Sequence, residues 1–166
     1  MDTFIIDTKT ITLLLATLFT GLLAGVFFTW SNAVVPGIGR LDDMGYLKAF
    51  QNMNRSILNP FFYLIFIGPL LFAGISAYFN QSNSVVFRLI ICAGIIYFTG
   101  VFLLTILGNI PLNEMLDKAD LSNITSEDAV FLRSKFEAKW NNFHLIRTIA
   151  SVVSFIVLII SCFLKV

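Results

Sequence analysis

Charged residues are absent from four long stretches of this sequence, and this spacing constrains the fold more than any other feature. The charge-free gaps run from Lys9 to Arg40, from Arg55 to Arg88, from Arg88 to Glu114 and from Arg147 to Lys165. A membrane-spanning helix needs about 20 mostly apolar residues. We therefore predict an all-α fold, an integral membrane four-helix bundle with spans at 11–35, 58–79, 86–108 and 145–164.

The composition agrees with lipid as the solvent of much of the surface. The chain has 166 residues, of which 57% are hydrophobic and 13% are charged, whereas a soluble domain carries about 25% charged residues. The formal net charge of +1 gives no indication of a nucleic-acid partner. No repeat, low-complexity tract or linker divides the chain, so residues 1–166 are expected to form a single transmembrane domain. The pattern specifies no oligomeric state.

Two polar connections carry helical patterns of their own. In residues 38–57, Asp42 or Asp43 is placed to cap a helix whose apolar side chains recur at helical spacing. In the third connection, Thr125-Ser-Glu-Asp128 resembles a capping box, and the helix it opens should run through Trp140 into the last span. We therefore predict short extra-membrane helices in the first and third connections.

Prolines mark the expected ends and bends of the helices. Pro36-Gly37 is expected to break the first helix, and Asn59-Pro60 to begin the second, because proline is tolerated in a first helical turn. Pro69 should kink the second span. In Asn109-Ile-Pro-Leu-Asn113 the proline frees a backbone carbonyl, which flanking amides are suited to satisfy. One interpretation of these asparagines is therefore that they cap a broken helix.

Small residues recur every four positions in the first span, at Thr17, Gly21, Gly25 and Thr29. Residues at this spacing lie along one face of a helix. Such a ridge of small side chains predicts close packing of another membrane helix against the first span.

Basic residues are divided unequally between the two faces of the membrane. With four spans both termini lie on one face, which carries Lys9, Arg88 and Lys165. The opposite face carries eight basic residues: Arg40, Lys48, Arg55, Lys118, Arg133, Lys135, Lys139 and Arg147. The positive-inside rule then places the connections on the His144 side in the cytoplasm and both termini on the opposite side.

The strongest candidate for chemistry is Trp140-Asn-Asn-Phe-His-Leu-Ile-Arg147, where the last span begins. His144 is the only histidine of the chain, and histidine is the side chain that ordinarily exchanges protons near neutral pH. In a helix Trp140, His144 and Arg147 share one face, which Ser151 and Ser154 extend into the membrane. The fixed charge of Arg147 disfavours a second positive charge on the imidazole, as a base requires.

Polar residues attached to all four spans gather at the membrane edge that carries this segment. Independent helix caps would be divided between both edges, so their accumulation at one edge favours a shared polar pocket. We expect His144 and Arg147 to be catalytic. Candidate substrate-binding residues at the same edge are Trp140, Asn54, Asn109, Asn113, Gln51, Asn32 and Trp30.

Four motifs, in this order along the chain, resemble the anthrone oxygenase-like family of small four-helix membrane proteins. They are Ala24-Gly-Val-Phe-Phe-Thr-Trp-Ser-Asn-Ala-Val-Val-Pro36, Phe50-Gln-Asn-Met-Asn-Arg-Ser-Ile-Leu-Asn-Pro60, Gly108-Asn-Ile-Pro-Leu-Asn113 and Trp140-x-x-x-His-x-x-Arg-Thr148. The resemblance implies a membrane-embedded bundle and an oxygenase. Fungal members oxidise polyketide anthrones to anthraquinones with dioxygen, without a metal or flavin. At the matching motif positions the resemblance implies six site residues: Asn54, Asn109, Asn113, Trp140, His144 and Arg147.

Two functions from different classes remain open. The first is a cofactor-independent oxygenase of a hydrophobic aromatic or phenolic substrate, with His144 as the base and Arg147 stabilising the anion that forms. The second is a non-catalytic bundle that binds a lipid, a quinone or a partner protein. There Trp140 anchors the interface, and His144 is an interhelical contact.

Other site chemistries find less support in the sequence. One histidine without a cysteine pair does not make a usual zinc site, so no metal is expected. The chain has no glycine-rich nucleotide motif. No carboxylate lies within a predicted span, although ion transport normally needs one.

Overall fold

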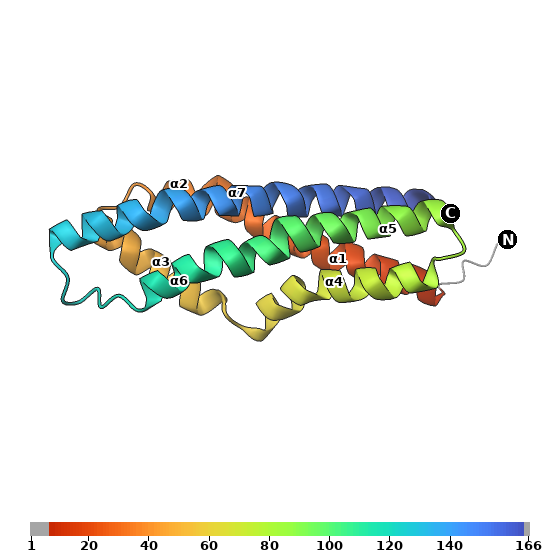
Figure 1. The fold of residues 1–166 in the computed structure, drawn as a ribbon, viewed down its shortest axis with the longest axis horizontal. Helices are drawn as coiled ribbons and strands as arrows, with labels where there is room; N and C mark the ends of the chain where they lie inside the picture. Colours follow the sequence, from red (N-terminus) through yellow and green to blue (C-terminus); the bar gives the residue numbers. More distant parts are fainter. Residues whose placement is uncertain (1–6, 165–166) are drawn as a thin grey trace.

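Four helical rods form the molecule. The computed structural model describes residues 7–164, and the rods that are long and apolar enough to cross a membrane are Thr8–Ile38, Pro60–Phe79, Ser84–Asp117 and Ser126–Leu164. The rods lie side by side, and the first begins at the end of the molecule where the last one ends (Figure 1). The prediction of an all-α membrane bundle with four spans is confirmed, since each predicted span overlaps one rod.

The four rods and one separate helix contain the following elements. The first rod consists of α1 (Thr8–Thr29), the π-helical turn η1 (Trp30–Val34) and α2 (Val35–Ile38); α3 (Asp43–Ile57) follows it, and α4 (Pro60–Phe79) is the second rod. The third rod consists of α5 (Ser84–Tyr97), the π-helical turns η2 (Phe98–Leu103) and η3 (Thr105–Asn109), and α6 (Ile110–Asp117). The fourth rod is the single helix α7 (Ser126–Leu164).

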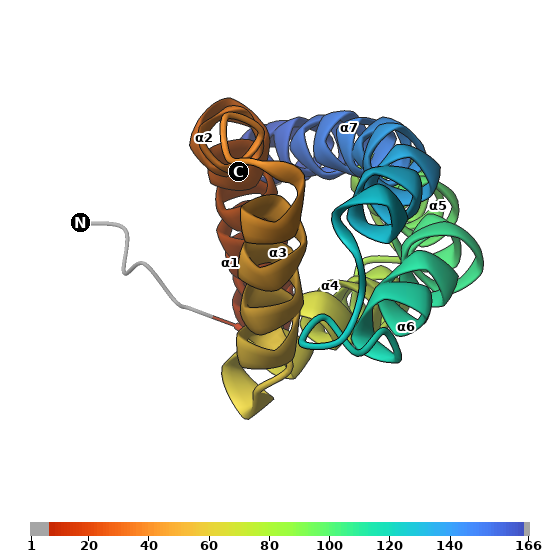
Figure 2. The same cartoon turned by 90° about the vertical axis from the view of Figure 1, so that its left-hand side faces the viewer.

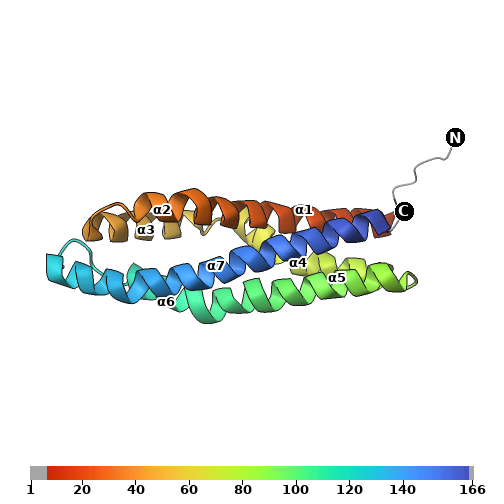
Figure 3. The ribbon, with the colours of Figure 1, turned by 90° about the horizontal axis from the view of Figure 1, so that it is seen from above.

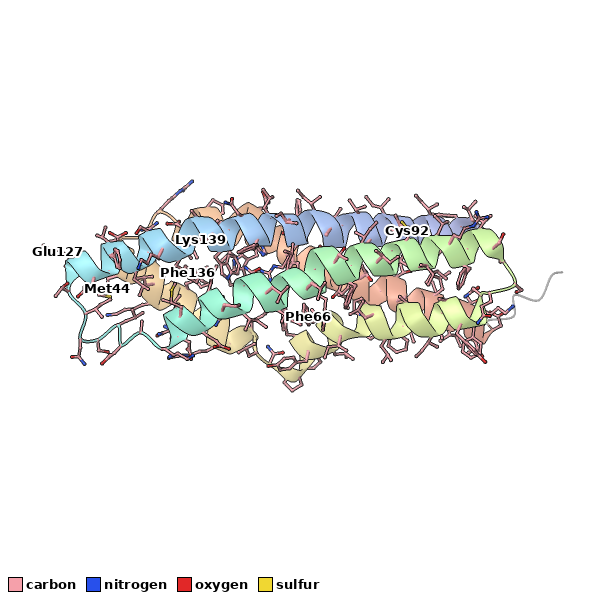
Figure 4. All side chains as sticks on the ribbon, in the orientation of Figure 1. Met44, Phe66, Cys92, Glu127, Phe136 and Lys139 are labelled. Carbon is pink, nitrogen blue, oxygen red and sulfur yellow. The ribbon has the colours of Figure 1, made fainter. Side chains whose placement is uncertain are left out.

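The four rods form a ring in which each packs against two neighbours. The helix α1 packs along α4 and α7, and α5 packs along the same two helices from the other side (Figures 2 and 3). Beyond this ring, α3, α6 and the first half of α7 form a second layer, which we call the headpiece. Its core contains a cluster of aromatic side chains that includes Tyr46, Phe50 and Phe136, the last of which is labelled in Figure 4.

Helix caps account for where the elements begin. The carboxylate of Asp42 accepts a hydrogen bond from the Gly45 amide at the start of α3, at 2.7 Å. At the start of α7 the Asp128 amide donates to the Thr125 hydroxyl, and the Thr125 amide donates back to the Asp128 carboxylate, as in a capping box. Asn59 caps α4. The predicted helices of the first and third connections are therefore confirmed.

The first rod ends at Ile38, one residue after the expected break at Pro36-Gly37. Pro36 lies in the first turn of α2, and the rod continues to Ile38 because the π-helical turn η1 precedes the proline. Likewise Pro111 lies in the first turn of α6, directly after η3, and the third rod is continuous. A π-helical turn is wider than an α-helical one, so both prolines are accommodated without ending the helix.

The closest helix packing lies mainly outside the predicted ridge of the first span. A Cβ on Gly21 would lie 2.6 Å from the Phe155 ring, but a Cβ on Gly25 would meet nothing within 4 Å. On the third rod, a Cβ on Gly100 would lie 2.5 Å from the Cβ of Ala150. The ridge prediction thus holds at one of its two glycines, and Gly100 marks a closer contact with α7.

Candidate functional site

A cavity of about 180 Å³ lies where the ring of rods meets the headpiece. All four rods and α3 contribute to its wall. The lining residues are Val26, Phe27, Trp30, Phe50, Asn54, Ile57, Leu58, Phe62, Tyr63, Phe66, Thr105, Ile110, Asn113, Trp140, His144 and Arg147; Figure 4 labels Phe66, on the α4 side. Most of the wall is apolar or aromatic, so its few polar groups must orient whatever binds there.

The cavity reaches the surface beside the first turn of α4. Three of its lining residues, Leu58, Tyr63 and Ile110, are themselves exposed. Phe61, in the first turn of α4, and Leu107, in the third rod, are the most exposed large apolar side chains near this opening. An opening with apolar surroundings suits a compound that dissolves in lipid better than in water.

Trp140 is held by two asparagines of the third rod. Its indole Nε1–H donates to the side-chain oxygen of Asn113 at 2.7 Å, and the Asn109 amide donates to the Trp140 carbonyl at 3.3 Å. These bonds join two rods, so the asparagines are interhelical contacts rather than caps of a broken helix. The Trp140 ring also stacks on the His144 ring, with 4.8 Å between the centroids.

The geometry around His144 determines which ring nitrogen carries the proton. Nη2 of Arg147 lies 3.0 Å from Nδ1, and a guanidinium can only donate. Nδ1 is therefore the unprotonated nitrogen. Nε2 lies 3.2 Å from the Phe27 carbonyl oxygen, which can only accept, so Nε2 carries the proton. His144 is thus a neutral imidazole whose lone pair faces Arg147.

Arg147 is buried with only neutral partners. Its side chain is 5% exposed, Nη1 donates to the Thr105 hydroxyl at 3.0 Å, and the guanidinium lies over the rings of Phe27 and Trp140. Within the described chain no carboxylate oxygen lies within 4.0 Å of it. A buried cation without a counter-ion is costly, so the site is electrostatically prepared for negative charge.

Six of the nine predicted site residues line this cavity: Trp30, Asn54, Asn113, Trp140, His144 and Arg147. Asn109 is buried behind Trp140. The other two lie elsewhere. Gln51 donates to the carbonyls of Leu116 and Ala119 at the end of α6, and Asn32 is exposed on η1. The side chain of Asn54 has no hydrogen-bond partner among the described residues, so its amide is available to a ligand.

Two contributors to the site were missed by sequence reasoning. Thr105 accepts the hydrogen bond of Arg147. Its position could have been predicted from helical spacing, because it lies four residues before Asn109 and eight before Asn113. The Phe27 carbonyl fixes the His144 tautomer. A backbone group carries no residue-type signal, so it was not predictable.

The described part of the chain offers no ready-made metal site. No group of three or more His, Cys, Asp or Glu side chains within it is placed to hold an ion. The groups available to a ligand are instead neutral amides, aromatic faces, one imidazole and one guanidinium.

Comparison with known proteins gives one match. Residues 61–157, more than half of the chain, match the family model for anthrone oxygenase. This segment contains the residues of α4, the third rod and α7 that line the cavity. The chain matches no curated protein and no solved structure.

Proposed function

Because the chain belongs to the anthrone oxygenase family, we propose that it is a cofactor-independent oxygenase of a hydrophobic aromatic or phenolic substrate, with His144 as the base. The observation that carries this proposal is the His144–Arg147 pair, a neutral imidazole 3.0 Å from a buried guanidinium in an apolar cavity. A base and a group that stabilises an anion are what proton removal from carbon requires.

The cavity suits an aromatic ring in shape and in size. Its wall includes the rings of Phe27, Phe50, Phe62, Phe66 and Trp140. An apolar cavity of about 150 Å³ takes up benzene, so about 180 Å³ admits one ring and its substituents. A fused three-ring substrate would place its remaining rings in the opening beside Leu58 and Tyr63.

The proposed reaction converts an activated CH₂ group into a carbonyl. His144 removes one proton from the carbon, and the resulting enolate gives its electrons to dioxygen, forming a C–O bond and a peroxide. The peroxide takes a proton back from the imidazolium. Loss of water, with the second hydrogen of the carbon, leaves C=O. One oxygen atom enters the product and the other leaves as water, so the substrate itself supplies all four electrons.

Proton removal requires Arg147 to exchange partners. In the resting protein Nδ1 accepts the hydrogen bond of Arg147, so its lone pair reaches a substrate only when Arg147 turns away. A substrate whose enolate oxygen lies near the guanidinium provides the replacement acceptor. The bond to an anionic oxygen is stronger than the bond to a neutral imidazole. We propose that the anion forms as this exchange proceeds.

A ligand-binding bundle without catalytic activity is the second candidate. The specific observation in its favour is that both ring nitrogens of His144 are engaged, one by Arg147 and one by the Phe27 carbonyl. In that case the hydrophobic molecule or lipid in the cavity would be retained unchanged.

The first prediction separates these two functions with His144→Gln. The amide of glutamine can accept from Arg147 and donate to the Phe27 carbonyl, so the fold and ligand binding should persist. The amide does not act as a base, so the turnover of anthrone to anthraquinone should fall about 10²–10⁴-fold. Dioxygen consumption measures this turnover. Ser82→Ala, in the exposed turn at the far end, is the control. Unchanged turnover in His144→Gln would remove His144 as the base.

A further inference from the structure

Arg147 has more hydrogen-bond donors than the described residues supply acceptors for it. A guanidinium carries five N–H groups. One bond goes to Thr105 and one to His144, and both acceptors are neutral. The buried Nε atom has no partner among the described residues. Part of this side chain's hydrogen-bonding capacity is therefore unused, and no anionic partner among the described residues balances its charge.

A second buried donor without an acceptor borders the same cavity. The indole nitrogen of Trp30 is buried and has no hydrogen-bond partner in the described chain. Buried polar groups are nearly always hydrogen-bonded, and an unpaired one costs about 1–3 kcal/mol. A ligand that supplies hydrogen-bond acceptors would account for both unpaired donors, Nε of Arg147 and Nε1 of Trp30.

The described residues of the wall supply no negative charge to balance the guanidinium. No acidic side chain is found among the described residues that line the cavity. The rings of Phe27 and Trp140 lie 4.8 and 5.4 Å from the guanidinium carbon, and they offer only the negative faces of their π-systems. These contacts position the guanidinium but leave its charge unmatched.

We propose that the cavity binds its ligand as an aromatic monoanion, with Arg147 as the counter-ion. The ligand carries a carboxylate or phenolate oxygen that Arg147 and the Trp30 indole bind, while its ring lies among the aromatic side chains. This proposal rests on the proposed function only in placing the ligand in the same cavity. It narrows the substrate class to compounds that already carry one ionised group when they bind, in addition to the CH₂ group from which His144 removes a proton.

The second prediction tests this class with two non-reactive probes of the same shape. 4-Nitrobenzoate is an anion, 4-nitrobenzamide is its neutral counterpart, and both quench tryptophan fluorescence. The two tryptophans of the chain both line the cavity, so quenching reports binding there. In nanodiscs of zwitterionic lipid we expect the anion to bind at least about tenfold more tightly. Arg147→Gln should abolish this preference, and Arg147→Lys should retain part of it.

Several outcomes would overturn the proposal. Equal affinities of the two probes for the wild-type protein would refute the proposal. This measurement needs no variant, so the proposal can be tested even if the Arg147 variants do not fold. A preference that survives Arg147→Gln would place the anion elsewhere. Dodecanoate displacing 4-nitrobenzoate at equal concentration would show an aliphatic anion site instead of an aromatic one.

The outcome is independent of oxygenase activity. Neither nitro compound has an oxidisable CH₂ group, and binding is measured without turnover. If anion preference is found but no anthrone is oxidised, the binding proposal stands and the oxygenase proposal fails. If anthrone is oxidised and the protein shows no preference for the anionic probe, the oxygenase proposal stands and the binding proposal fails.

Discussion

The third prediction concerns the stability of the buried His144–Arg147 pair. Removing one member of the pair is expected to change the free energy of unfolding by a different amount than removing the other. The perturbations are Arg147→Met, His144→Leu and the double variant. Arg147 is 5% exposed and His144 is 2% exposed, so each substitution acts on a group removed from solvent. The two single variants leave different groups unpaired, and this difference determines the expected free energies of unfolding.

Arg147→Met removes a buried charge that has no carboxylate partner in the part of the chain that the structure describes. The folded state loses two hydrogen bonds to a charged group, about 1.5–3 kcal/mol each, and leaves Nδ1 of His144 without a donor. It also avoids a desolvation penalty of several kcal/mol for the buried ion. Thr105 still donates to the Val101 carbonyl at 2.7 Å, so it is not orphaned. These terms nearly cancel, and we expect a change within about 2 kcal/mol.

His144→Leu leaves the charge in place and removes one of its two acceptors. Breaking a buried pair so that an uncompensated charge remains costs about 3–5 kcal/mol. The imidazole is already neutral and is one acceptor of two, so we expect a loss near the lower end of this range. The double variant has neither the charge nor the orphaned nitrogen. It should therefore be about as stable as Arg147→Met, with a coupling energy of at least about 2 kcal/mol.

The assay is reversible unfolding by SDS in mixed micelles, followed by circular dichroism on all four proteins of the cycle. Added 4-nitrobenzoate should stabilise the wild type and not Arg147→Met, because only the wild type keeps the counter-ion. Additive single effects would refute the reasoning. So would an Arg147→Met variant less stable than His144→Leu, because the guanidinium would then be a net stabilising group.

Two further predictions test packing and topology. Gly100→Ala should destabilise the protein by about 1–3 kcal/mol, because the new Cβ would lie 2.5 Å from the Cβ of Ala150. Gly74→Ala, where nothing lies within 4 Å, is the matched control and should be neutral or slightly stabilising in thermal unfolding. In a chain without its native cysteines, Ser82→Cys and Asp120→Cys should be labelled from opposite sides of the membrane, with Asp120 cytoplasmic. Labelling of both from one side would contradict this topology.

Much of the fold was predictable because lipid imposes a simple rule on the sequence. Charge-free stretches of sufficient length must become helices, since a spanning backbone has to satisfy its own hydrogen bonds. The helices of the headpiece were predictable for a different reason. Asp42 and Thr125 supply caps, and the apolar side chains that follow them recur at helical spacing.

The polar face of the last rod was predictable from helical geometry alone. Trp140, His144, Arg147, Ser151 and Ser154 are all buried, as expected for one face of α7. Spacing within a helix could not give the partners of that face. The proton position on His144 depends on Arg147 and on the Phe27 carbonyl, which belongs to another rod. For the same reason Gln51 was assigned to the pocket although it binds carbonyls at the end of α6.

Two prolines connect the course of the first and third rods with the site. Pro36 comes six residues after Trp30, and Pro111 comes six residues after Thr105. In both rods a five-residue π-helical turn begins at the first residue of the pair and ends two residues before the proline. The amide after each turn donates to the carbonyl five residues earlier, that of Trp30 or of Thr105.

A proline ring clashes with the carbonyl four residues before it and removes one amide donor. The wider turn relieves this clash while the rod continues, and π-helical turns occur frequently at functional sites. Here each turn begins at a residue that borders the cavity, one with an unpaired indole N–H and one with the hydroxyl that binds Arg147. The same proline spacing in two rods therefore has a common consequence. It preserves two membrane-length helices and sets a polar side chain of each in the wall of the cavity.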